Sequence, residues 1–156
     1  MGRGAACHDR DRELNSPRLA KPSPHTPARP RLLVIELWGL GDLALALPLL
    51  QKATAHADVT LLARPHAAPL LTRFAPAVGH VSISAPWTAF AGKYRLHQWP
   101  WREIFRVLRH LRSCRFDIGV SARSDPRDHL LLALAGAGQR LGFARAGSGV
   151  FLTKAL

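Results

Sequence analysis

Short apolar runs alternate with helix-like segments from Arg31 to Phe143, and this alternation constrains the fold more than any other feature. Residues 32–37 are almost continuously apolar, which is typical of a strand buried on both faces of a parallel sheet. Later strand patterns lie at 58–63, 78–84, 116–121 and 139–143. Helix patterns lie between them at 43–53, 66–74, 101–114 and 127–135. This order with short connections predicts right-handed crossovers and a doubly wound parallel α/β sheet of the Rossmann-like kind.

The first 30 residues differ from the rest of the chain. Five of the twelve prolines lie there among Arg, His, Asp and Ser, without apolar periodicity. Such a segment cannot bury enough surface to offset its ordering entropy. We therefore expect a disordered basic tail over 1–30 and one domain over 31–156. A chain of 156 residues, 47% of them hydrophobic, suits one domain and is too short for a two-domain enzyme.

The charge balance favours an anionic partner. The sequence has 22 Lys and Arg against 10 Asp and Glu, a net charge of +12. Nucleic acid, an anionic membrane or a phosphorylated substrate would suit this excess, although GC-rich coding DNA produces the same bias. No apolar run approaches the roughly 18 residues of a membrane-spanning helix. The histidines show no metal-ligand spacing, so we expect no metal and no other cofactor.

Ligands of a doubly wound sheet bind at the carboxyl ends of its strands. The predicted loops at 38–42, 64–66, 84–100 and 122–128 therefore form one candidate surface. In the first of them, Gly39 and Gly41 would allow a tight turn and a close ligand, and the helix start suits an anion. Alanine at position 44 breaks the dinucleotide fingerprint, and no Gly-Lys-Ser/Thr follows, so the segment is not a P-loop either.

Asp42 has two interpretations. It is a helix N-cap or first-turn carboxylate, which would stabilise the helix by about 1 kcal/mol. Alternatively, it is a general base at the mouth of a cleft, placed there by a rigid strand-to-helix turn. Its position in the sequence allows both.

The stretch LLVIELWGLGDLALALPLLQKA, residues 32–53, resembles the opening of the bacterial lipopolysaccharide heptosyltransferases, glycosyltransferase family nine. In that family a first strand leads into a Gly-Asp turn and an apolar helix with a Leu-Pro pair. Gly41-Asp42 and Leu47-Pro48 match these features. The resemblance continues through 59–71, 101–143 and 147–153, and so covers essentially everything after residue 31.

The resemblance implies the N-terminal half of a GT-B glycosyltransferase, which holds the acceptor. The donor-binding C-terminal domain would be absent, so this chain alone is expected to be inactive. Family members are metal-independent and inverting, and their usual partners are the nucleotide-sugar donor ADP-heptose and an anionic glycolipid acceptor of the lipopolysaccharide core. Asp42 matches the motif aspartate that deprotonates the acceptor hydroxyl.

An anionic acceptor with phosphates and carboxylates would suit arginines near the cleft, because guanidinium groups bind oxyanions bidentately. Each such arginine has a plainer alternative as a solvated surface charge. Asp125 and Asp128 are expected mainly as helix caps, with a weaker secondary role in orienting the acceptor. The expected acceptor-binding residues are Gly39, Gly41, Arg64, Arg123, Asp125 and Arg127, with Lys93 and Arg95 as further candidates.

Three arginines of the helix at 101–114, Arg102, Arg106 and Arg109, could face anionic lipid headgroups. Trp87, Trp99 and Trp101 would then be interfacial anchors, or would simply pack the long loop. We accordingly expect a cytoplasmic protein, peripheral at most at the cytoplasmic face of the inner membrane.

Two other function classes stay open. The first is a non-catalytic α/β binding domain whose basic face meets anionic membrane or nucleic acid, although we expect no nucleic acid. The second is the nucleotide-binding domain of an oxidoreductase. It is the weakest, because the third glycine and an acidic residue closing the strand at 58–63 are absent.

Overall fold

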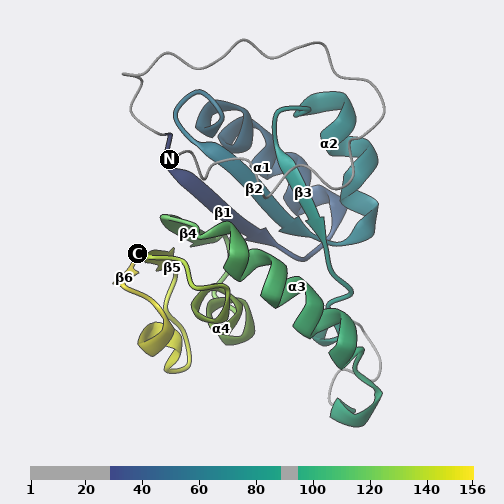
Figure 1. Ribbon diagram of the computed structural model, residues 1–156, viewed down its shortest axis with the longest axis vertical. Coiled ribbons are helices and arrows are strands. Elements are labelled where there is room, and N and C mark those ends of the chain that lie inside the picture. Colours follow the sequence, from purple (N-terminus) through teal and green to yellow (C-terminus); the bar gives the residue numbers. More distant parts are fainter. Residues whose placement is uncertain (1–28, 89–94) are drawn as a thin grey trace.

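A computed structural model of the protein describes residues 29–88 and 95–156. It contains one sheet of six strands in the order β3-β2-β1-β4-β5-β6, and every neighbouring pair is parallel (Figure 1). The strands are β1 (Arg31–Glu36), β2 (Asp58–Ala63), β3 (Gly79–Ser82), β4 (Ile118–Ser121), β5 (Gln139–Gly142) and β6 (Lys154–Ala155). The helices are α1 (Leu40–Ala53), α2 (Ala68–Phe74), α3 (Trp101–Cys114) and α4 (Pro126–Ala135). Short 3-10 helices are η1 (Pro65–Ala67), η2 (Pro86–Thr88), η3 (Leu96–Gln98) and η4 (Ser148–Phe151).

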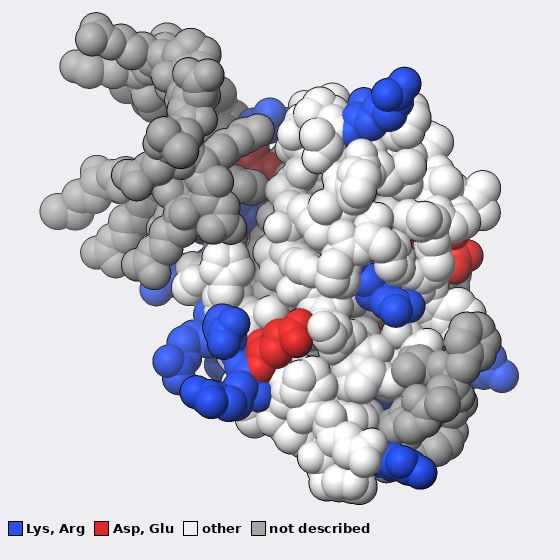
Figure 2. All heavy atoms as spheres, turned by 90° about the vertical axis from the view of Figure 1, so that its right-hand side faces the viewer, with Lys and Arg blue, Asp and Glu red and all other residues white. Residues whose placement is uncertain are grey.

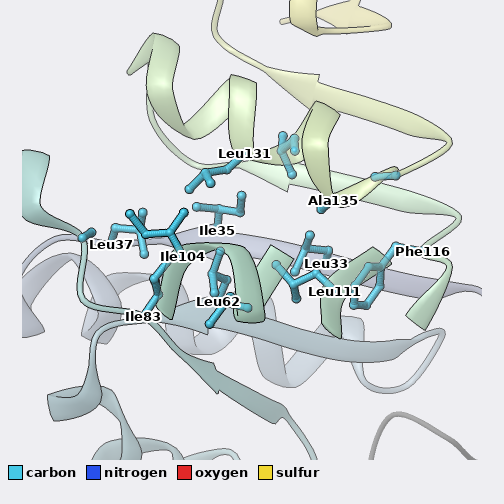
Figure 3. Close-up of a cluster of buried hydrophobic side chains, with 14 of the residues drawn as sticks. Leu33, Ile35, Leu37, Leu62, Ile83, Ile104, Leu111, Phe116, Leu131 and Ala135 are labelled. Atoms are coloured by element: carbon cyan, nitrogen blue, oxygen red, sulfur yellow. The ribbon is translucent and has the colours of Figure 1, made fainter. Parts of the chain in front are cut away.

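The helices cover both faces of the sheet. On β1, Leu33 and Ile35 point into a core shared with α3 and α4 (Figure 3). Val34, between them, points to the other face and packs with side chains of α1 and α2. Successive residues of a strand point to opposite faces, so a strand buried on both sides must be apolar throughout. The predicted doubly wound parallel α/β fold is confirmed.

Most elements lie where the sequence predicts them. The bounds of β2 and α3 agree with the prediction, and the segment 66–74 divides into η1 and α2. Pro48 lies inside one continuous helix, α1. The short elements η4 and β6 were not predicted.

Residues 1–28, most of the predicted tail, lie outside the described part of the chain. The next two residues contact the start of β2: Pro30 accepts a hydrogen bond from the backbone N–H of Asp58 at 2.9 Å, and the Arg29 guanidinium lies 3.9 Å from the Asp58 carboxylate. Within residues 29–88 and 95–156, no helix has the length and apolar character needed to cross a bilayer.

The sheet has a switch point between β1 and β4. From β1 the chain crosses through α1 to β2 on one side, whereas β4 pairs with β1 on the other side and leads to β5. The loops that follow β1 and β4 therefore diverge, and such a divergence leaves a crevice at the carboxyl ends of the strands.

Candidate functional site

One contact bridges the switch point. The guanidinium carbon of Arg123, in the loop after β4, lies 3.6 Å from the centre of the Trp38 ring, in the turn after β1. A cation over an indole face at this distance is attracted by the ring quadrupole. Because 48% of Trp38 is exposed, the pair stands at the surface of the crevice.

Asp128 holds Arg123 from the interior. Its side chain is fully buried, and Oδ2 lies 3.5 Å from Nη1 of Arg123 in an ion pair that lacks hydrogen-bond alignment. The other oxygen, Oδ1, accepts from the indole N–H of Trp87 at 3.4 Å. Burial raises the pKa of Asp128 to about 6, the charge of Asp125 adds to the rise, and Arg123 opposes it. The expectation that Asp128 mainly caps a helix was wrong, because its carboxylate pairs with these two side chains.

His129 fixes the backbone of the same loop. Its Nε2 lies 2.9 Å from the carbonyl oxygen of Arg123, and its Nδ1 lies 2.8 Å from the hydroxyl of Ser148. A carbonyl only accepts hydrogen bonds, so we assign the proton to Nε2. Gly142 leaves room for the ring, since a Cβ there would lie 2.8 Å from Nε2.

A cavity of about 620 Å³ opens beside this loop. Ser148 positions one of its walls, because its hydroxyl accepts from the backbone N–H of Arg145 at 3.0 Å. The loop after β4, the turn after β5 and the segment before α3 thus meet at one opening. Its lining residues are Leu96, Trp99, Arg123, Ser124, Asp125, Pro126, Arg127, Arg145 and Ala146.

Asp125 and Arg127 form a tight local pair on this wall. Asp125 caps α4 by accepting from the backbone N–H of Arg127 at 2.9 Å, as predicted. It also accepts from Nε and Nη2 of the Arg127 guanidinium at 3.0 and 2.8 Å. Burial alone would raise the pKa of Asp125, but the hydrogen bonds and charge of Arg127, with the charge of Arg123, lower it. Asp125 thus already holds the guanidinium of Arg127.

Asp42 lies in the first turn of α1, exposed to solvent. Gly39 is the N-cap, and no side chain caps the helix. The N-cap is therefore excluded, and two interpretations of Asp42 remain: a first-turn carboxylate that stabilises the helix, and a general base.

The two glycines before Asp42 were expected to make a tight turn possible. Gly39 has a φ of −79°, which any residue adopts, and the only described glycines with positive φ are Gly136 and Gly147. A Cβ on Gly41 would meet nothing within 4 Å. The turn does not require glycine, so the expectation that these glycines make a tight turn possible was wrong. The space beside both positions is open.

Glu36 is a site residue that sequence reasoning did not select. It ends β1, is 5% exposed, and accepts from the backbone N–H of Trp38 at 3.0 Å. Burial raises its pKa, the Trp38 hydrogen bond lowers it, the charge of Asp42 raises it, and that of Arg123 lowers it. Glu36 thus lies within electrostatic reach of both Asp42 and Arg123. A carboxylate that ends an otherwise apolar strand was the available signal.

The structure does not place Arg64 at the cavity, and it does not describe Lys93. Arg64 is half-buried after β2, at the start of η1, and does not line the cavity. Lys93 lies outside the described residues. Within the described ranges, no three His, Cys, Asp or Glu side chains are arranged to hold a metal ion.

The tryptophans of the long loop divide into two kinds. Trp87 is 5% exposed and Trp99 is half-buried, and their ring centroids lie 5.4 Å apart against the core of the α3 face. These two pack the loop, so the alternative of interfacial anchors was wrong for them. Trp101 is 41% exposed.

Comparison with known proteins gives matches only among solved structures: no protein-family model and no curated protein matches the sequence. The structure of Escherichia coli ADP-heptose LPS heptosyltransferase II has a TM-score of 0.59 and 20% identity, over 80% of this chain and 34% of that one. The glycosyl transferase family 9 structure from Veillonella parvula DSM 2008 has a TM-score of 0.61 and 20% identity, over 84% and 37%. E. coli heptosyltransferase WaaC with ADP-2-deoxy-2-fluoro heptose has a TM-score of 0.62 and 17% identity, over 81% and 42%.

The chain therefore spans between about a third and two fifths of the length of these structures. At 17–20% identity the likeness concerns the fold. The resemblance seen in residues 32–53 is confirmed at that level: this chain has the fold of one part of the heptosyltransferases and of a family 9 glycosyltransferase.

Proposed function

We propose that this chain is the acceptor-binding part of a heptosyltransferase-like glycosyltransferase, in which Asp42 is the general base. The donor would be a nucleotide sugar such as ADP-heptose, and the acceptor an anionic sugar chain of the lipopolysaccharide-core type. The observation that carries the proposal is the exposed carboxylate of Asp42 in the first turn of α1, the helix that follows β1, with an arginine held across the adjoining switch point. The likeness of fold to heptosyltransferase structures supports it.

Arg123 is suited to bind an anionic group of the acceptor. Its guanidinium is held by the Trp38 ring on one side and by Asp128 on the other, and it also lines the cavity. A guanidinium held in this way loses little side-chain entropy on binding a phosphate or carboxylate. The Arg127 guanidinium already donates two hydrogen bonds to Asp125, whereas the ion pair of Arg123 with Asp128 lacks hydrogen-bond alignment, so we assign the main anion contact to Arg123.

Asp42 would act on the acceptor hydroxyl. As the hydroxyl oxygen attacks the anomeric carbon of the donor, the carboxylate takes the hydroxyl proton, and the bond from the anomeric carbon to the phosphate oxygen breaks. The nucleoside diphosphate leaves from the opposite face, which inverts the anomeric centre. The reaction so written needs no metal from this chain. The second GT-B domain would hold the donor.

The test is a glycosyl-transfer assay on a longer protein, in which this chain is extended by the residues that the downstream DNA encodes. ADP-heptose is the donor, and Kdo-containing sugars are the acceptors. Asp42→Asn should lower kcat by about a hundredfold or more with acceptor affinity retained, because only the proton acceptor is lost.

Asp58→Asn is the matched control, since Asp58 is an exposed carboxylate at the opposite end of the sheet. Transfer that survives Asp42→Asn within a few-fold would rule out the base assignment. Absence of turnover in the unsubstituted protein would favour a non-catalytic binding domain instead.

A further inference from the structure

Three apolar side chains near the start of α3 lie together on the surface. Leu96 is 56% exposed, Trp101 41% and Phe105 65%. The indole N–H of Trp101 donates to the carbonyl oxygen of Leu96 at 2.8 Å, and the ring centroids of Trp101 and Phe105 lie 6.2 Å apart. The side chains of Trp101 and Phe105 are therefore neighbours, and the backbone of Leu96 contacts the Trp101 ring. Exposed apolar groups of this size so close together indicate an interaction surface.

The solvent face of α3 beside them is basic. Arg102, Arg106 and Arg109 are exposed and lie three or four residues apart, where like charges repel and destabilise a helix. The carboxylate of the same turn, Glu103, is turned away and accepts from the backbone N–H of Ser84 at 2.7 Å. Among residues 29–88 and 95–156, no ion pair joins these arginines to a carboxylate. The view in Figure 2 likewise shows basic side chains at more places than acidic ones.

These residues adjoin the candidate acceptor cavity. Leu96 and Trp99 belong to its lining, and the ring of Trp99 lies 5.3 Å from that of Trp101, centroid to centroid. One side of the group thus forms the rim of the cavity. We call the group the aromatic–basic patch; it consists of Leu96, Trp101, Phe105, Arg95, Arg102, Arg106 and Arg109.

We propose that the aromatic–basic patch docks the protein on an anionic membrane surface. Arginines near such a surface are attracted by its negative potential, and aromatic and leucine side chains enter the boundary between headgroups and acyl chains. Binding of nucleic acid would explain the arginines but not the exposed side chains of Leu96 and Phe105. Docking by this face brings the cavity to the level of the headgroups. The further step, that the cavity there meets a lipid-anchored acceptor, rests on the proposed function.

The experiment measures binding of the chain to sedimented vesicles that contain no acceptor and no donor, so its result does not depend on glycosyl transfer. Vesicles of phosphatidylcholine alone are compared with vesicles that also contain phosphatidylglycerol, at low and at physiological salt. We expect binding to the anionic vesicles only, weakened by salt. Failure to bind them would overturn the docking proposal and leave the proposed function as it stands.

Two variants separate the parts of the patch. Arg102→Gln with Arg106→Gln should weaken binding roughly thirtyfold, from the loss of two surface charges. Phe105→Ser should weaken it roughly tenfold with little change in salt dependence. The controls are Arg73→Gln on α2, an exposed arginine, and Leu45→Ser on α1, where the leucine is 83% exposed. Neither control should change binding by more than about twofold.

The double arginine variant also tests whether the charges serve docking or folding. Because it relieves repulsion along α3, its melting temperature should equal or exceed that of the unsubstituted chain. Binding to duplex DNA as strong as to anionic vesicles, with no effect of Phe105→Ser on either, would replace the membrane by a general polyanion and overturn the proposal.

Discussion

The guanidinium carbon of Arg123 lies over the Trp38 ring, 3.6 Å from its centre, and this contact joins the loops that follow two neighbouring strands of the sheet. Arg123 is also paired with Asp128, and its carbonyl oxygen is held by His129. Both ends of the residue are therefore fixed. An arginine with so little remaining freedom is placed in advance for an anion at the switch point.

Trp38→Leu should weaken binding of a Kdo-containing acceptor by roughly fivefold, the loss expected for one partly exposed cation–π contact. Stability should change little, because 48% of the ring is exposed in the folded chain. Isothermal titration calorimetry with the acceptor measures the affinity, and thermal unfolding measures the stability.

Phe74→Leu is the matched control for this substitution. Phe74 is also 48% exposed and also has an arginine over its ring, Arg73 at 5.7 Å, but it lies on α2 away from the switch point. Acceptor affinity should be unchanged in this variant. An equal loss in both variants would show that the Trp38–Arg123 contact has no special part in binding.

Asp128→Asn should make the folded chain more stable at neutral pH. The folded-state pKa is about 6, above the 3.8 of a free aspartate, so the folded state binds the proton more tightly. As pH rises from about 4 to about 6, Asp128 therefore lowers the free energy of unfolding, and the loss persists above pH 6. Asn cannot ionise and avoids this loss, which corresponds to up to about 3 kcal/mol.

Urea unfolding of both proteins between pH 4 and pH 8 measures the difference. Glu36 and Asp125 titrate in both proteins and interact with the charge of Asp128, so the difference between the curves measures Asp128 together with its coupling to these two carboxylates. The gain should grow from pH 4 to about pH 7 and then level off. A constant difference across this range would mean that the pKa of Asp128 is the same in the folded and the unfolded chain.

The same substitution should weaken acceptor binding, because Arg123 loses its only ion-pair partner in the described part of the chain. Greater stability with poorer binding would mark Asp128 as a positioning residue. A merely structural carboxylate would change stability alone.

The fold could be predicted from the sequence because a strand that is buried on both faces of a sheet has a recognisable pattern of apolar residues. A strand such as 32–37 must be apolar at every position, and the helices between strands must be apolar at helical spacing. The short elements η4 and β6 were not predicted, because they have only four and two residues and such short segments show no hydrophobic periodicity. Their positions depend on contacts such as that of Ser148 with His129, which only the folded chain brings together.

The candidate site was predictable only in part. The rule that ligands meet strand carboxyl ends selected Asp42, Arg123 and Asp125. The rule did not distinguish the roles of Asp125 and Asp128, because both are carboxylates at the start of a helix. Their difference is burial: Asp125 faces the Arg127 guanidinium at the wall of the cavity, whereas Asp128 is fully buried. No local pattern separates the two.

Gly41→Ala should leave the melting temperature unchanged or raise it. Gly41 lies in the first turn of α1 with no positive φ, and a Cβ there meets nothing within 4 Å. Alanine is favoured over glycine in helices by up to about 1 kcal/mol. Thermal unfolding would check this. A marked fall in stability would restore a structural reason for glycine, whereas weaker acceptor binding at equal stability would indicate that a ligand occupies this space.

Gly142→Ala should displace the ring of His129, which holds the loop of Arg123. The new Cβ would lie 2.8 Å from Nε2 of His129 and 3.4 Å from Leu152, so the ring must move away from the carbonyl oxygen of Arg123. We expect a loss of about 1–3 kcal/mol in stability from overpacking. Since the loop of Arg123 loses its anchor, acceptor affinity should fall as well.

Gly149→Ala is the control, because its Cβ would meet only Ala144 at an ordinary 3.7 Å. Urea unfolding and calorimetry on both variants decide the matter: an unchanged acceptor affinity in a destabilised Gly142→Ala chain would separate His129 from the site and limit it to packing.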